Sequence, residues 1–348
     1  MRVAFVTLET THTNDTRRTR RLERVAKQLT ATGEHEVAFC CAQWWGGDVE
    51  SFEHDGITYH RVTVDASPRK FATRVPFVLR RTDPDLILAS YWPPVAAIGA
   101  GTGRWFSRVP IVVDWYGDHP IDEPTRSVRT SMRLADRIIS PSEYVQTGVR
   151  ELGAYQESTR IVPESIDMPL VRRVSPTDGP NIVTARRFDE HANIETMLLG
   201  LAELRDRDWQ AAIIGDGPRR SAYERQAQEL RIDDRVTFTG RLSLEERLAC
   251  YKGAHVFVQT AERCPFANEL LRALACGCAG IVDYQAESAA HELVEALNRG
   301  FLTTSSEALS EAIVEAAEHE QRTVNERFAR YDHETVLETY LELFESLR

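Results

Sequence analysis

Residues 210–218 read Gln210-Ala211-Ala212-Ile213-Ile214-Gly215-Asp216-Gly217-Pro218, a short apolar run that ends in a glycine turn. A run of this length bounded by Gly and Pro favours a strand that is buried on both faces. The same unit recurs around it, as an apolar run, a few polar residues and a segment with helical spacing. Strands are predicted over 181–185, 210–214, 235–238, 255–259 and 280–284, and the strand over 280–284 is expected to be the last of the sheet. Helices are predicted over 194–205, 220–230, 244–251 and 268–276. This alternation predicts a doubly wound parallel sheet.

The N-terminal half repeats the alternation, with a first helix over 17–29. Its predicted strands lie at 3–8, 36–41, 57–62, 86–89, 111–114 and 137–140. Residues 175–180, Ser-Pro-Thr-Asp-Gly-Pro, have the composition of a linker. We therefore expect one domain over 1–172, a second over 178–329, and an amphipathic helix over about 330–348 that packs back on the first. Ligands of such sheets bind beyond the carboxyl ends of the strands, so we expect the active site between the domains.

Composition limits the class of protein. The chain has 348 residues, a formal net charge of −11, 42% hydrophobic residues and 27% charged residues. The length favours two domains of about 150 residues, and the acidic balance argues against a nucleic-acid partner. No apolar run approaches the roughly 20 residues of a membrane span, and the first residues lack the features of a signal peptide. We expect a cytoplasmic protein.

The rarer residue types add two expectations. The six cysteines contain no C-x-x-C pair and predict no metal site, only reduced, mostly buried thiols. Just three of the 42 basic residues are lysines, Lys27, Lys70 and Lys252. A lysine-poor, acid-rich surface suits a halophile's salt-rich cytoplasm, although GC-rich coding explains the bias equally well. The absence of a G-x-G-x-x-G fingerprint, a P-loop and an H-E-x-x-H pair argues against dinucleotide, P-loop and zinc-peptidase chemistry.

Five segments are together similar to the family 4 retaining glycosyltransferases of the GT-B fold. They are Ile213–Pro218, Asp234–Leu242 and Phe266–Gly277 in the C-terminal half, and Ala135–Glu143 and Ile161–Asp167 in the N-terminal half. Their order and distances carry the resemblance, which covers nearly the whole chain. It implies a GT-B architecture, in which two Rossmann-like doubly wound domains face a central cleft. The C-terminal domain would bind a nucleotide-sugar donor and the N-terminal domain an acceptor.

The resemblance implies a phosphate-binding arginine after the first strand of the second domain, where Arg186 and Arg187 stand. A guanidinium grips phosphate oxygens in a two-point fork, and a departing diphosphate needs such positive charge. Whether Arg186 or Arg187 faces the donor stays open. The alternative that both are ordinary solvated arginines also stays open. The family's lysine about five residues later has no counterpart, and His191 either substitutes as a pH-dependent cation or leaves that charge missing.

The family also has two glutamates, one for the sugar and one for the ribose, at positions that hold Cys264 and Arg272 here. Glu262 and Glu269 are the candidate replacements, and Glu269 precedes Arg272 by one helical turn. The alternative is that both are ordinary surface acids.

Backbone groups are further donor-side candidates. Phe266, Ala267 and Asn268 open a helix, and helix N-termini attract phosphate. Gly215, Gly240 and Arg241 follow the neighbouring strands, with simple turns as the alternative interpretation.

In the N-terminal half, Asp118 and His119 follow a strand where the family carries a histidine near the reacting sugar. With Arg186 they are the candidate catalytic residues, which would position sugar hydroxyls or stabilise charge at the anomeric carbon. His12 and Asn14, in a polar loop, are candidate acceptor contacts, and a solvated loop is the alternative.

Four arginines, Arg17, Arg18, Arg20 and Arg21, crowd the start of the first predicted helix. They suggest contact with a phosphorylated acceptor or with the cytoplasmic face of a membrane. A solvated helix start is the simpler interpretation.

The resemblance implies sugar transfer from a nucleotide sugar to a glycan, a lipid-linked molecule or a small molecule, with retention of anomeric configuration. The nucleotide sugar is a co-substrate, and neither a cofactor nor a metal ion is expected. Two alternatives stay open: a sugar-nucleotide epimerase or phosphorylase of the same fold, and a non-catalytic nucleotide-sugar-binding or scaffolding subunit of a glycan-assembly complex.

Overall fold

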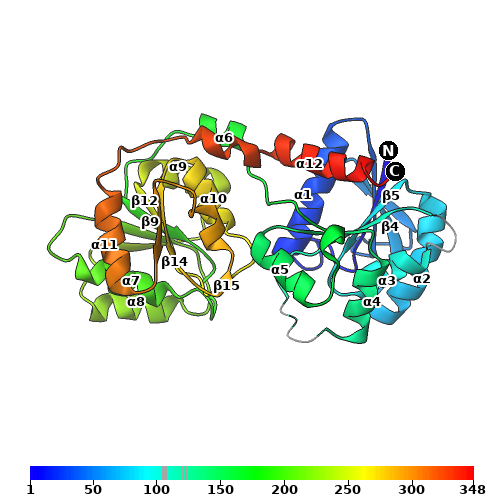
Figure 1. Ribbon diagram of the computed structural model, residues 1–348, viewed down its shortest axis with the longest axis horizontal. Helices are drawn as coiled ribbons and strands as arrows, with labels where there is room; N and C mark the ends of the chain where they lie inside the picture. Colours follow the sequence, from blue (N-terminus) through cyan, green and yellow to red (C-terminus); the bar gives the residue numbers. More distant parts are fainter. Residues whose placement is uncertain (104–107, 120, 122–123) are drawn as a thin grey trace. The chain divides into compact units, whose positions relative to one another are not determined.

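The computed structural model describes residues 1–103, 108–119, 121 and 124–348. The chain divides into two compact units, residues 1–164 with 334–348, and residues 165–333 (Figure 1). This boundary differs from the expected one, which assigned residues 165–172 to the first domain. Met168, Leu170 and Val171 of helix α6 (Met168–Arg173) are part of the hydrophobic core of the second unit.

The first unit is built on one large sheet. In the part that the structure describes, it has eight strands in the order β3-β4-β2-β1-β5-β6-β7-β8, parallel except for the antiparallel pair β3–β4. The strands are β1 (Arg2–Val6), β2 (Glu36–Ala42), β3 (Ser51–His54), β4 (Ile57–Thr63), β5 (Leu86–Ser90), β6 (Ile111–Asp114), β7 (Arg137–Ser140) and β8 (Thr159–Ile161).

Helices cover both faces of this sheet. They are α1 (Arg17–Ala31), α2 (Pro68–Thr82), α3 (Val95–Gly103), α4 (Arg126–Leu134), α5 (Glu143–Glu151) and α12 (His333–Glu345). Alternate residues of β1 enter two different cores, since Ala4 and Val6 pack with α2–α5 and Val3 and Phe5 pack with α1 and α12. Side chains of a strand alternate between faces, so a strand that is apolar throughout lies between two helical layers.

The second unit repeats the plan on a smaller sheet. Residues 165–333, all of them described, form six parallel strands in the order β11-β10-β9-β12-β14-β16 and a two-stranded parallel pair, β13–β15. The strands are β9 (Ile182–Ala185), β10 (Ala211–Ile214), β11 (Val236–Gly240), β12 (Val256–Gln259), β13 (Arg263–Cys264), β14 (Ala279–Asp283), β15 (Glu287–Ser288) and β16 (Gly300–Thr303). The helices besides α6 are α7 (Ile194–Glu203), α8 (Arg220–Glu229), α9 (Leu244–Gly253), α10 (Asn268–Ala275) and α11 (Ser306–Ala316).

The expected fold class, two doubly wound parallel-sheet units, is confirmed, and five strands were not predicted: β3, β8, β16 and the two-residue strands β13 and β15. The strand predicted over 280–284 is not the last, because β16 follows it and pairs with β14. All four residues of β3 are exposed, so no apolar run marks it, and β8 is only three residues long.

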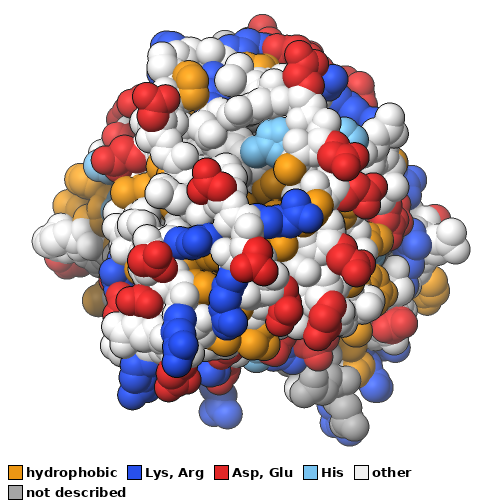
Figure 2. Space-filling model, turned by 90° about the vertical axis from the view of Figure 1, so that its left-hand side faces the viewer, with side chains coloured by type: hydrophobic (Ala, Val, Ile, Leu, Met, Phe, Trp, Pro, Cys, Tyr) orange, Lys and Arg blue, Asp and Glu red, His pale blue; other side chains and the backbone are white. Residues whose placement is uncertain are grey.

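Surface charges of both signs are intermixed on the face drawn in Figure 2. No helix among the described residues combines the length and the apolar composition that crossing a bilayer requires.

Candidate functional site

Loops that carry predicted residues line up at the carboxyl edge of the second sheet. Strands β11, β10, β9 and β12 are consecutive neighbours, and the chain leaves them at Gly240, Ile214, Ala185 and Gln259. The predicted residues from 186 to 191, at 215, at 240–241 and from 262 onward therefore follow adjacent parallel strands. This is the edge at which ligands of open parallel sheets bind.

Arg186 and Arg187 are placed differently. The Arg186 side chain is 8% exposed, and its Nη2 lies 3.5 Å from Asp189 Oδ1. The same nitrogen donates to the carbonyl oxygen of Arg263 at 3.3 Å. Both distances exceed the usual length of a charge-assisted hydrogen bond, about 2.8 Å. Arg187 is exposed.

The glycine turn after β10 holds the Arg186 backbone. The Arg186 amide donates to the carbonyl of Ile214 at 2.9 Å, and the Phe188 amide to that of Asp216 at 3.1 Å. Gly215 has a φ of +140°, and a Cβ there would lie 1.8 Å from the carbonyl oxygen of Arg186. Gly240, with a φ of +74°, pairs with Gly215 as an isolated bridge. The turn therefore does more than reverse the chain, because only glycine permits this approach.

His191 and Glu262 come together beside this loop. The amide of Glu262 donates to the His191 carbonyl at 3.1 Å, and Glu262 Oε2 lies 3.6 Å from His191 Nδ1. The Glu262 side chain is 51% exposed. His191, the predicted substitute cation, and Glu262, the predicted sugar contact, are thus neighbours beside the loop that carries Arg186. Arg241, by contrast, is simply exposed.

The loop before α10 turns its side chains inward. Cys264, Phe266 and Ala267 are 2%, 5% and 4% exposed and belong to the core. Ala267 at the N-cap makes no side-chain cap hydrogen bond, in contrast to Ser243, which caps α9. Asn268, the first residue of α10, is partly buried, and Glu269 places a carboxylate in the same first turn.

Glu269 sits in a network that the sequence did not indicate. Its Oε2 accepts from the Tyr251 hydroxyl at 2.7 Å, and its Oε1 accepts from Arg272 at 2.7 Å. Arg247 lies 3.6 Å from Oε1. Burial and the Glu269 carboxylate raise the pKa of Tyr251, so its hydroxyl stays a donor. Glu269 and Arg272, one helical turn apart on α10, thus form an ion pair that also includes the Tyr251 hydroxyl as a donor.

In the first unit, Asp118 is tied to the first helix. Its Oδ1 accepts from Arg18 Nη1 at 3.1 Å and from the Tyr91 hydroxyl at 2.9 Å. The other Arg18 Nη donates to Glu9 at 3.2 Å, and Glu9 also accepts from the Asn14 side chain at 2.9 Å. The structure thus joins the predicted residues Asn14 and Asp118 through Arg18.

The arginine cluster is not a solvated helix start. The side chains of Arg18 and Arg21 are 7% and 1% exposed. Arg21 donates to Asp114 at 2.9 Å and to the carbonyls of Val162 and Pro163 at 2.7 and 3.0 Å. Two of the four arginines are therefore buried in ion pairs, which corrects the expectations of a solvated helix start and of membrane contact for Arg18 and Arg21. Sequence spacing could not reveal this, because the partners are distant along the chain.

His119 lies next to this network. Its amide donates to the Tyr91 hydroxyl at 2.7 Å, and its ring stacks on Trp92 at 3.7 Å between centroids. Burial and the charge of Arg18 lower the pKa of His119, while Asp118 opposes them. The imidazole is therefore largely neutral at pH 7.

His12 and Asn14 have different partners. The His12 ring stacks on Trp44 at 3.7 Å between centroids, and the centroids of the His54 and Tyr59 rings lie edge-on at 5.4 and 6.2 Å. Asn14 donates to Glu9 instead.

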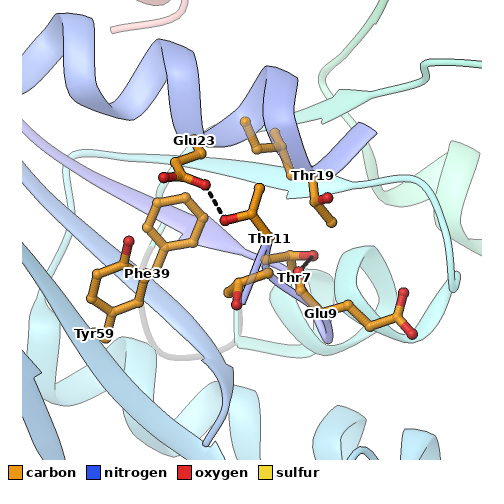
Figure 3. Close-up of a pocket in the computed structure, with 9 residues that line it drawn as sticks. Thr7, Glu9, Thr11, Thr19, Glu23, Phe39 and Tyr59 are labelled. Atoms are coloured by element: carbon orange, nitrogen blue, oxygen red, sulfur yellow. Dashed lines mark hydrogen bonds between the residues drawn. The ribbon is translucent and has the colours of Figure 1, made fainter. Parts of the chain in front are cut away.

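A small pocket lies between this loop and α1 (Figure 3). Thr11 donates to Glu23 at its rim, and the rings of Phe39 and Tyr59 form one wall. Its lining is Thr7, Glu9, Thr10, Thr11, Thr19, Leu22, Glu23, Phe39 and Tyr59. Glu9 lines this pocket and also contacts Arg18, and Arg18 contacts Asp118 in the loop that carries His119.

In the described ranges, no group of three or more His, Cys, Asp or Glu side chains is arranged to hold a metal ion.

Two family models match the chain. The model described as "Glycosyl transferases group 1" matches residues 171–334, and "Glycosyl transferase 4-like domain" matches residues 19–164. The two matches together account for most of the chain, one in each unit.

Two curated proteins are similar over part of the chain. The alpha-monoglucosyldiacylglycerol synthase of Streptococcus pneumoniae is 27% identical over 167 residues, which are 43% of this chain and 38% of that protein. The 2-deoxystreptamine glucosyltransferase of Streptomyces kanamyceticus is 30% identical over 145 residues, 37% of each. The matches thus span well under half the length of either relative.

Solved structures match the fold over the full length. Anabaena HepE in complex with UDP is similar with a TM-score of 0.76 at 19% identity, covering 100% of both chains. At this identity, the likeness shows the fold.

Proposed function

Since the chain belongs to the group 1 glycosyl transferases of the GT-B fold, we propose that it transfers a sugar from a nucleotide-sugar donor to an acceptor hydroxyl. The second unit would bind the donor and the first unit the acceptor. The observation that carries the proposal is the position of Arg186 at the carboxyl edge of the second sheet, on a backbone that Gly215 holds in place.

In this proposal the donor diphosphate meets Arg186 and the backbone amides at the start of α10. As the bond between the sugar and the diphosphate breaks, negative charge grows on the leaving oxygen. A guanidinium and oriented amides stabilise that charge without having to reorganise.

The remaining donor contacts follow from the same placement. Glu269, oriented by Tyr251 and Arg272, would accept hydrogen bonds from the ribose hydroxyls. Glu262 and His191, beside Arg186, would contact the sugar.

On the acceptor side, His119 would contact the sugar as a neutral imidazole, a hydrogen-bonding group rather than a cation. Asp118 would hold the loop that carries it. We further propose retention of the anomeric configuration, in a scheme that gives no role to a metal ion.

A second candidate is a nucleotide-sugar-binding subunit without turnover. One observation favours it: Cys264 stands where the family has its sugar-binding glutamate, and it is buried in the core at 2% exposure. No side chain at that position then reaches a sugar, and Glu262 would have to supply the contact from two residues away.

Donor binding and turnover separate these candidates. Thermal unfolding is measured with UDP, GDP and ADP sugars, beginning with UDP because the similar HepE structure holds UDP. A donor at 100 times its Kd stabilises the protein by about 2.7 kcal/mol. Arg186→Ala and Glu269→Ala should abolish the shift, and Arg187→Ala, at an exposed position, should retain it.

Turnover is then followed as nucleotide release with and without a panel of acceptors, and the anomeric configuration of the product is determined by NMR. Binding without any turnover would favour the non-catalytic subunit. A donor shift that survives Arg186→Ala would overturn the proposed site.

A further inference from the structure

Arg18 joins two loops of the first unit that are far apart in the sequence. Its guanidinium lies between Glu9, in the loop after β1, and Asp118, in the loop after β6, at 3.2 and 3.1 Å. Its Cζ stands 5.9 Å from the centroid of the Tyr91 ring, which follows β5. One side chain thus contacts three loops at the carboxyl edge of the first sheet.

The start of α1 fixes this side chain firmly. Thr16 caps the helix by accepting from the Thr19 amide, and Thr19 reciprocates with the Thr16 amide. Arg18 follows in the first turn and is 7% exposed. A buried arginine held on a capped helix end has little freedom to leave its partners.

The same helix provides a contrast that points away from a purely structural role. Arg21, one turn later, binds the buried Asp114 and the carbonyls of the buried Val162 and the partly buried Pro163. The carboxylates that Arg18 holds are partly exposed, 29% for Glu9 and 16% for Asp118. The guanidinium thus ties loops after three strands to α1 at a partly exposed part of the sheet edge, so the placement of these loops is a direct consequence of the Arg18 contacts.

We infer that Arg18 is a positioning residue for the transfer reaction: through Asp118 and Tyr91 it fixes the segment that presents His119, and through Glu9 it fixes the loop that carries Asn14. The inference rests on the proposed function. The chain of contacts is continuous, from Arg18 to Asp118 Oδ1, from Asp118 to the Tyr91 hydroxyl, and from that hydroxyl to the His119 amide.

Arg18 also acts on His119 through its charge. Among the described residues, burial and Arg18 lower the pKa of His119 and Asp118 raises it. Removing the guanidinium takes away a lowering influence and leaves Asp118 without its cation. Both changes raise the pKa of His119.

The first test is direct titration. NMR spectra of histidine-labelled protein are recorded against pH, with His119→Gln used to assign the signal. Arg18→Met should move the His119 midpoint to higher pH, and Arg18→Lys, which keeps the charge, should move it less. Arg20→Met is the matched control, because Arg20 lies on the same helix and pairs with the exposed Asp15. An unchanged midpoint in Arg18→Met would overturn the inference.

The second test uses turnover. Arg18→Lys keeps the charge and loses the two-point fork, so its kcat should fall about 10- to 100-fold through misplacement of the reacting groups. In Arg18→Met the acid limb of kcat should also move to higher pH, while the thermal shift with the donor, bound by the second unit, stays unchanged. An Arg18→Lys variant with the kcat of the parent protein would contradict the inference. This test remains decisive even if the Arg18→Met variant does not fold. Absence of turnover in the parent protein would count against the proposed function alone, since the titration does not depend on it.

Discussion

Arg18 and Arg21 in the first unit are held differently from Arg186 in the second. In the first unit, Arg18 and Arg21 lie directly against carboxylates, at 2.9 to 3.2 Å. In the second unit, the contacts of Arg186 with Asp189 and with a carbonyl oxygen are longer, 3.5 and 3.3 Å. These contacts of Arg186 are longer than those of Arg18 and Arg21 with their carboxylates.

The means of placement differ as well. Side-chain ion pairs between a helix and distant loops place Arg18 and Arg21. Close backbone packing places Arg186. The turn at Gly215 lies against the Arg186 carbonyl group, and the amides of Arg186 and Phe188 donate to carbonyls at the end of β10 and in the turn that follows it. The first arrangement depends on charge and the second on the absence of a side chain. Substitutions of each kind test the contrast.

The largest effect is expected from Arg21→Met. It leaves Asp114 buried without its cation, and removal of one partner of a buried ion pair costs about 3–5 kcal/mol. The free energy of unfolding is measured in urea by tryptophan fluorescence, which reports mainly on the first unit because Trp44, Trp45, Trp92, Trp105 and Trp115 precede residue 165 and only Trp209 follows it. Arg20→Met, at an exposed pair, should change the value by less than about 0.5 kcal/mol. Equal effects of the two substitutions would remove the contrast between buried and exposed arginines of α1.

An intermediate effect is expected from Gly215→Ala. The φ of +140° disfavours alanine, and its Cβ would meet the Arg186 carbonyl oxygen at 1.8 Å. The strain costs about 1–3 kcal/mol, and displacement of Arg186 should weaken donor binding about tenfold in a titration with a UDP sugar. Gly148→Ala is the matched control, since Gly148 lies within α5 with no atom near the added methyl group. It should stabilise slightly, by about 0.4–1 kcal/mol. Unchanged donor affinity in Gly215→Ala would show that the turn does not place Arg186.

The smallest effect concerns pH and the first unit. Burial lowers the pKa of His12, His35, His60 and His119 in the folded protein. Between about pH 7 and pH 5.5 the unfolded chain then binds more protons than the folded one, so stability falls as the pH falls below about 6.5. Urea unfolding at pH 7.5 and pH 5.5 measures the loss, and His60→Gln should reduce it. Stability that rises on acidification over this range would contradict the prediction.

Much of the fold followed from local pattern. The apolar runs at 210–214 and 255–259 predicted strands β10 and β12, and the helix over 17–29 appears as α1. Elements without such a pattern were not predicted, as the exposed strand β3 shows. The domain boundary near residue 165 was not predicted either, because it depends on which hydrophobic core Met168 and Val171 enter.

The candidate site divides along the same line. The sequence predicted that Arg186 and His119 follow strands and therefore lie at the carboxyl edges of their sheets. The contact of Glu269 with Tyr251 was not predicted, because Tyr251 lies on another helix, α9. Their roles in binding and catalysis remain predictions.

The sequence by itself determined the alternation of strands and helices, and with it the strand ends at which polar residues gather. Periodicity and turn residues act over a few positions, so they are visible in the chain before it folds. Only the tertiary structure decided which charges neutralise one another. Arg18 and Asp118 are 100 residues apart and meet at 3.1 Å, whereas Arg20, two residues from Arg18, pairs with its neighbour Asp15 at the surface. Electrostatic pairing depends on distance in space, and the order of residues leaves that distance undetermined.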